Sequence, residues 1–148
     1  MIISAHAAAG AFIGAAIKPE SKKAWAGTIV LALGSHALLD FVPHWHYSFI
    51  PLWLALDIIA ALVIVFLIIK ITRVKNGSDK AVVIAALVAA GADIEYVLVE
   101  FSLLLPEPVF LSHRPGFPHL HAGFFWGNIT QFMVVVISLA GSYYLSRN

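Results

Sequence analysis

Histidine and acidic residues that could bind a metal ion lie within or beside long apolar segments of this 148-residue chain. His36 and Asp40 are four residues apart, so on a helix they share one face. Two ligands of one ion, or a ligand and the carboxylate that orients it, have this spacing. The same spacing also fits a polar contact between helices, or a histidine hydrogen-bonded to its neighbouring carboxylate.

A second group begins with Asp93 and Glu95 and continues with His113, Arg114 and His119. In a regular helix, side chains two residues apart point about 200° apart. Both acids can therefore serve one site only if the helix is distorted or lies between two polar neighbours. Prolines and a glycine around the two histidines predict a shaped loop, where histidine and arginine are often functional. Loop histidines exposed to water are the common alternative.

Two further polar residues stand within apolar sequence. His6 has small residues on both sides, alanine before it and three alanines and a glycine after it, so its helix can approach its neighbours closely and bury the ring as a ligand. Asp57 is the lone polar residue of the run 49–69, and acids inside a membrane usually belong to a site. A protonated acid that makes one hydrogen bond between helices is the alternative for Asp57.

Histidine, bound protons, backbone donors, water or a metal ion could compensate the buried charge of these acids, and among them we expect a divalent cation, which can also use imidazole as a ligand. A carboxylate near the centre of a bilayer costs about 2.5 to 3.5 kcal/mol on insertion scales. Mixed His, Asp and Glu ligands suit zinc best, with manganese, iron or nickel as alternatives. The chain has no cysteine, which excludes thiolate-bound metals and thiol nucleophiles. The predicted metal ligands are His6, His36, Asp40, Asp93, His113 and His119.

The elements that must position these residues are predicted to be membrane-spanning helices. The chain is 61% hydrophobic and 11% charged, with a mean hydropathy of +0.91, which lies outside the balance of soluble domains. Five apolar runs each have about the 17 to 25 residues that a bilayer crossing needs. They predict one all-α domain, a polytopic integral membrane helix bundle, with helices at about 1–17, 24–42, 49–69, 81–105 and 122–145. The first run lacks the basic start of a signal peptide, so we expect it to remain as a helix.

The distribution of charge predicts an orientation in the inner (plasma) membrane of the cell. Eight of the nine lysines and arginines lie at one set of predicted helix ends, which marks that side as cytoplasmic, and Arg114 is the exception. All seven histidines belong to the opposite half. We therefore expect the N-terminus outside, the C-terminus in the cytoplasm, and the metal site in the extracytoplasmic half.

Four motifs resemble those of a family of small membrane-bound hydrolases that are predicted to depend on a metal. The family includes proteins described as LexA-binding inner membrane-associated hydrolases. The similar residues are His6 with Gly10, Asp93 with Glu95, His113-Arg114 with His119, and Ser35-His36 with Asp40. The chain departs from the family pattern in four ways. The two loop histidines are one residue farther apart than in the pattern. Ala92 stands in place of a proline, Glu95 replaces a second aspartate, and the Ser-His helix precedes the acidic segment.

The resemblance implies metal-assisted hydrolysis of a small-molecule or lipid-like substrate, with phosphoesters as a natural class. In that interpretation Glu95 or Asp57 takes a proton from the attacking water as the general base. Arg114 holds an anionic group of the substrate.

Three other functions are compatible with the sequence. Transport of protons or metal ions would use the same buried acids, although the inner halves of the five runs are almost entirely apolar. A haem-binding bundle and a purely structural metal site are the other two. The lipid bilayer is the expected partner, the bundle could form a homo-oligomer, and a net charge of +1 argues against nucleic acid as a ligand.

Overall fold

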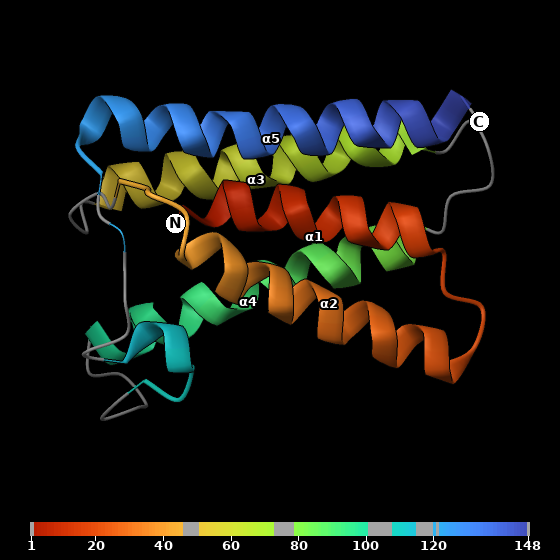
Figure 1. Ribbon diagram of the computed structural model, residues 1–148, viewed down its shortest axis with the longest axis horizontal. Helices are drawn as coiled ribbons and strands as arrows, with labels where there is room; N and C mark the ends of the chain where they lie inside the picture. The colour runs from red at the N-terminus through yellow and green to blue at the C-terminus, as the bar shows by residue number, and fades with distance from the viewer. Residues whose placement is uncertain are drawn as a thin grey trace.

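Five α-helices make up the fold in the computed structural model, which describes residues 2–45, 51–72, 79–100, 108–114, 120 and 122–147. They are α1 (Ile3–Ile17), α2 (Lys22–Asp40), α3 (Pro51–Thr72), α4 (Asp79–Glu100) and α5 (Phe124–Arg147), with a short 3₁₀ helix, η2 (Leu111–His113), before α5. Successive helices run in alternate directions along the long axis of the molecule (Figure 1). The prediction of an all-helical protein is confirmed.

Local sequence signals explain where several helices begin and end. The Ser21 hydroxyl accepts a hydrogen bond from the Ala24 amide (3.2 Å), which caps α2 and starts it two residues before the predicted boundary. Pro51 opens α3, where a residue without an amide hydrogen is well tolerated. Lys18 ends α1 in a left-handed conformation (φ 46°), and its amide donates to the Gly14 carbonyl.

Helix α1 is the centre of the bundle. It packs against all four other helices, while α2 also packs against α4, and α3 against α5. Figure 1 shows α3 and α5 on one side of α1, with α2 and α4 on the other. Apart from His6, the buried residues of α1 are all serine, alanine or glycine, so its neighbours can approach closely from several directions.

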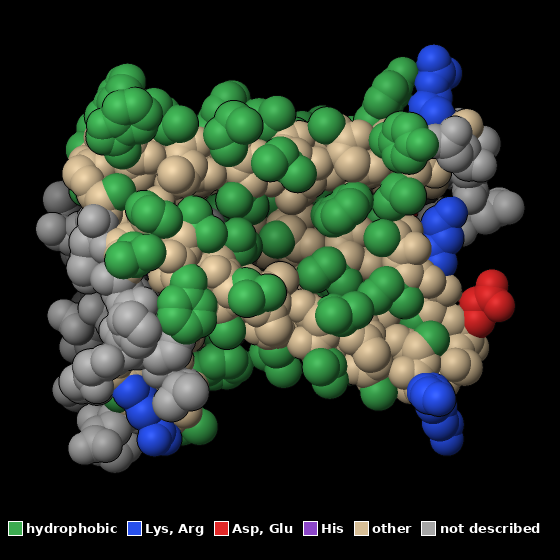
Figure 2. Space-filling model, in the orientation of Figure 1, with side chains coloured by type: hydrophobic (Ala, Val, Ile, Leu, Met, Phe, Trp, Pro, Cys, Tyr) green, Lys and Arg blue, Asp and Glu red, His purple; other side chains and the backbone are tan. Residues whose placement is uncertain are grey.

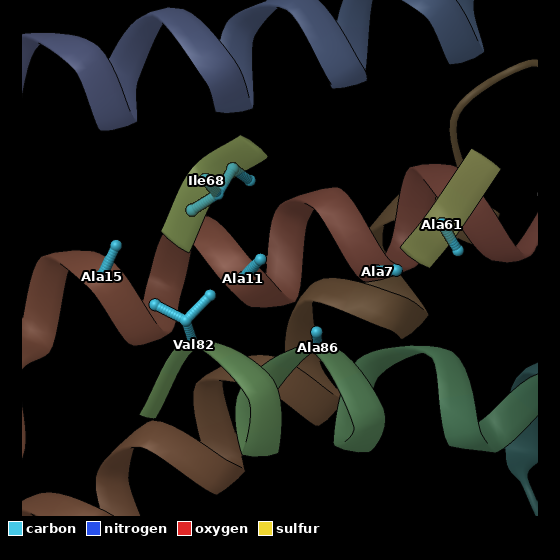
Figure 3. Packing of buried hydrophobic residues seen from close by; sticks show 7 residues of the cluster. All are labelled: Ala7, Ala11, Ala15, Ala61, Ile68, Val82 and Ala86. Carbon is cyan, nitrogen blue, oxygen red and sulfur yellow. The ribbon is translucent and has the colours of Figure 1, made fainter. Parts of the chain in front are cut away.

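A core of small side chains joins α1 to α3 and α4 (Figure 3). Its fully or nearly buried members are Ala7, Ala11, Ala15, Ala61, Ile68, Val82 and Ala86. Gly10 and Gly14 lie one turn apart on α1. A methyl group added at Gly10 would overlap the Ala85 carbonyl oxygen, and one added at Gly14 would overlap the Ala81 carbonyl oxygen. The backbones of α1 and α4 are therefore in direct contact, which only glycine allows at these two positions.

The segment around His44 ties α5 to the end of α2. The hydroxyl of Thr130 donates to the Pro43 carbonyl (2.5 Å), and the Gln131 amide donates to the Trp45 carbonyl (2.8 Å). The backbone of His44 also pairs with residues 120 and 122, through bonds of 3.1 and 2.9 Å. These bonds hold together the chain segments at the end of the bundle where α2 ends and α5 begins.

Two of the described helices are long and apolar enough to cross a membrane, by length and composition. They cover Leu52–Thr72 and Phe124–Arg147. α1 is a shorter apolar helix of 15 residues, whereas α2 and α4 contain acidic and basic residues that lower their hydropathy. Figure 2 shows hydrophobic side chains over the middle of the bundle and Lys and Arg side chains at its ends. Two helices therefore have the length and composition of membrane spans, while five crossings and their orientation stay predictions.

Candidate metal centre

Five of the six predicted metal ligands meet in the part of the bundle formed by α1, α2, α4 and η2. The five side chains are His6 of α1, His36 and Asp40 of α2, Asp93 of α4, and His113 of η2. The first three are at most 1% exposed, while the side chains of His113 and Asp93 are 6% and 15% exposed. The group is thus almost enclosed, with its small remaining exposure on the side of α4 and η2.

The shortest separations in the group involve His36 and Asp40. Nε2 of His36 is 3.2 Å from Oδ2 of Asp40, and Nε2 of His6 is 3.4 Å from Oδ1 of the same carboxylate. Nε2 of His36 is also 3.2 Å from Nε2 of His113. His36 therefore lies next to the Asp40 carboxylate and to both other imidazoles, those of His6 and His113.

Asp93 completes this arrangement from α4. Its Oδ2 is 3.9 Å from Nε2 of His6, and its Oδ1 is 3.9 Å from Nε2 of His113. Ligand atoms at about 2.0 to 2.2 Å from one zinc ion in a tetrahedron are about 3.4 Å from each other. Separations of 3.2 to 3.9 Å fit donors arranged around a single ion. Two overlapping sets of three ligands, which share His36, meet this requirement.

The orientation of His36 is fixed by a bond outside the group. Its Nδ1 is 2.8 Å from the carbonyl oxygen of Ala89 on α4, to which it can only donate a proton. In the neutral ring, Nε2 of His36 then carries the lone pair, on the side of Asp40 and His113. The ring also stacks on that of His6, with 4.0 Å between centroids and 29° between planes. A hydrogen bond to a backbone carbonyl on the remote ring nitrogen is typical of histidines that bind metals.

Some polar atoms of the group are buried without a hydrogen bond from the described residues. They include both ring nitrogens of His6 and Oδ2 of Asp93. Buried polar atoms are nearly always satisfied in native proteins, so these atoms need a further partner. A metal ion held by this group would provide one for Nε2 of His6 and for Oδ2 of Asp93.

His113 reaches the group from a segment outside the long helices. Burial of the ring lowers the pKa of His113 to about 4, so the ring is neutral at pH 7, in the form that binds metals. The ring of Phe110 lies 5.8 Å from that of His36 and 6.0 Å from that of His113, between ring centroids. Phe110 thus covers the two histidines with an apolar surface.

The two acids predicted as general bases contact backbone amides. The Asp57 carboxylate accepts hydrogen bonds from the amides of Ile3 (2.8 Å) and Ser4 (3.1 Å), at the start of α1. Both oxygens of Glu95 accept from the Phe110 amide, at 2.8 and 3.0 Å. α4 therefore lies between two polar neighbours, because Asp93 faces the ligand group and Glu95 faces the segment before η2. Neither Asp57 nor Glu95 belongs to the two ligand sets.

The remaining predicted site residues lie at the edge of the group or outside the described part of the chain. Arg114 follows His113 directly, is exposed, and donates from Nε to the Pro108 carbonyl (3.2 Å). His119 falls outside the described residues. His44, which is not a predicted ligand, is fully buried, but its Nδ1 lies 2.6 Å from the Val42 carbonyl and it belongs to neither ligand set.

Sequence reasoning did not identify the carbonyl of Ala89 or the amide and ring of Phe110 as parts of the site. Alanine and phenylalanine carry no signal for such a role, since the backbone atoms involved are common to all residues. Comparison with known protein families, curated proteins and solved structures found no match for this chain. The function therefore has to be argued from the geometry of the site.

Proposed function

We propose that this chain is a membrane-embedded, metal-dependent hydrolase whose ion is held by several of His6, His36, Asp40, Asp93 and His113, with one coordination position left open for water. The observation that carries the proposal is the convergence of these buried side chains from four separate elements, with separations of 3.2 to 3.9 Å. Two aspartates and three imidazoles form a donor set that suits zinc and neighbouring divalent ions. An ion would also offset the cost of burying two carboxylates side by side.

The geometry favours a single ion over a haem. The rings of His6 and His36 stack at 4.0 Å, and Asp40 lies between their ligand atoms. A haem held by two histidines needs the space between them for its macrocycle. That space does not exist here, so the haem alternative loses support.

A divalent ion at this site supplies Lewis acid chemistry, which activates water and polarises an ester. The protein contributes an enclosed, apolar surrounding and a small exposed side at Asp93 and His113. Water and substrate would enter from that side. Arg114, exposed and adjacent to His113, offers a guanidinium to an anionic group such as a phosphoester.

Hydrolysis should depend on the ion. We expect the detergent-purified protein to carry about one divalent ion per chain and to hydrolyse members of a panel of phosphoesters and lipids. Chelation should abolish the activity, and zinc or manganese should restore it. Mass spectrometry gives the metal content, and product release gives the rate. If no preparation binds a metal after reconstitution, the hydrolase proposal is wrong and proton-coupled transport becomes the leading alternative.

We also propose that all five helices cross the inner membrane, with the N-terminus outside and the metal site in the extracytoplasmic half. The absence of cysteine makes this testable by labelling. A membrane-impermeant maleimide should label Arg114→Cys in intact cells. The matched exposed position Lys22→Cys should react only after the membrane is permeabilised. Labelling of both positions, or the reverse pattern, would contradict this orientation.

A further inference from the structure

We infer that Asp57 and Glu95 are positioning residues, each of which holds the chain segment that carries one histidine ligand. Asp57 holds the segment that carries His6, and Glu95 holds the segment that carries His113. The inference rests on the proposed metal site and gives these two acids a role different from that of a general base. It follows from a geometry that the two acids share, although they lie on different helices.

Asp57 replaces the missing cap of α1. Ile2 stands at the N-cap position and its side chain offers no hydrogen bond to the helix. Asp57 of α3 supplies both carboxylate oxygens to the amides of Ile3 and Ser4, and the residue is only 7% exposed. A carboxylate at a helix N-terminus is favoured by the amides and by the helix dipole. The first turn of α1 is thereby fixed to α3.

His6 lies within that first turn. It is three residues after Ile3, and its own amide donates to the Ile2 carbonyl (3.4 Å). Nε2 of His6 lies 3.4 Å from Oδ1 of Asp40. A shift of the first turn away from Asp57 would therefore move this imidazole away from Asp40. Asp57 itself need not touch the ion to determine where His6 stands.

Glu95 has the same relation to His113. Both of its oxygens accept from the Phe110 amide, and the residue is only 9% exposed. His113 is again three residues further on, and its own amide donates to the Phe110 carbonyl (3.1 Å). Asp93 lies two residues before Glu95 on the same helix. α4 therefore provides Asp93 as a proposed ligand and, through Glu95, holds the segment that carries His113.

This pairing predicts selective coupling in zinc affinity. Loss of a group that orients a ligand typically costs about 10- to 100-fold in metal affinity. We expect Glu95→Ala to weaken zinc binding by about this factor in the wild type and in His6→Ala, with little further effect in His113→Ala. Asp57→Ala should show the reverse pattern, with its effect lost in His6→Ala. Zinc titration against a chromophoric chelator measures all of these variants.

The conservative variants separate positioning from proton transfer. Glu95→Gln keeps a carbonyl oxygen that can accept from the Phe110 amide, so it should recover most of the lost affinity. Asp57→Asn keeps one acceptor oxygen for the two amides of Ile3 and Ser4, so it should recover only part of the lost affinity. Equal coupling of each acid to both histidines would contradict the inference, as would strictly additive losses. A Glu95→Gln variant that binds zinc as weakly as Glu95→Ala would also overturn it.

Hydrogen exchange tests the same contacts without a metal. In Asp57→Ala, exchange should accelerate at the amides of Ile3 and Ser4 and stay unchanged at Phe110. In Glu95→Ala the pattern should be the opposite. Unchanged exchange at these amides would overturn the inference whatever the zinc affinity. A wild-type protein that binds no zinc but shows this exchange pattern would instead disprove the proposed metal site while leaving the two contacts established.

Discussion

A His36→Ala variant is expected to bind zinc at least about 100-fold more weakly than the wild type, because loss of an orienting partner alone costs about 10- to 100-fold. His36 belongs to both ligand sets, and its Nε2 lies within 3.2 Å of Asp40 and His113. Its removal also leaves the ring of His6 without its stacking partner. Competition titration would measure the affinity, and mass spectrometry would measure the metal that remains after purification.

His44→Gln is the matched control for this variant. His44 is also a fully buried histidine, but it lies outside the ligand sets. The control should therefore keep the ion, although the change can affect the contacts of the segment with α5. If His36→Ala retained wild-type affinity, the proposed centre would be wrong. Loss of the ion in both variants would show that burial of a histidine, and not ligation, determines binding.

Gly14→Ala is expected to destabilise the bundle strongly. The added methyl group would overlap the Ala81 carbonyl and force α1 away from α4 along the closest contact in the core. Overpacking of a close-packed core costs about 1 to 3 kcal/mol, and a backbone contact leaves little freedom to relax. Unfolding in mixed micelles with increasing sodium dodecyl sulfate, followed by circular dichroism, measures the loss of stability.

Gly91→Ala provides the comparison for this prediction. Gly91 is also a helical glycine, on α4, but an added methyl group there would meet no atom within 4 Å. The same chemical change should leave stability unchanged or raise it slightly, because alanine favours a helix over glycine. A comparable loss in both variants would argue against the close contact of α1 with α4.

Apolar length predicted the helices, and residue type predicted five side chains that meet in the candidate metal centre. Each of the five runs contains a helix in the structure, although the start of α2 at Lys22 depends on local capping by Ser21 that hydropathy does not detect. The central place of α1 could not be predicted from length. It follows from a surface of small residues that lets four neighbours pack around one helix.

The sequence could not predict which acids face the proposed metal ion and which bind backbone amides. Asp40, Asp93, Asp57 and Glu95 are all acids in apolar helices, and nothing in their local spacing separates them. In the fold, the first two face imidazoles and the last two face backbone amides. That difference depends on which element lies opposite each acid, which is a property of the tertiary structure alone.

The order of the proposed ligands along the chain would also make ion capture a late event in biogenesis. His6 enters with the first helix, but the last imidazole of the site follows α4, so the pocket is complete only after most of the protein has been made. The ion would then link three helices that were inserted separately. An unfolded chain lacks this site, so the ion would bind only the folded protein. The free energy of unfolding would then fall with the logarithm of the free ion concentration when the metal is scarce. Its abundance in the cell would therefore depend on metal supply, as would its activity.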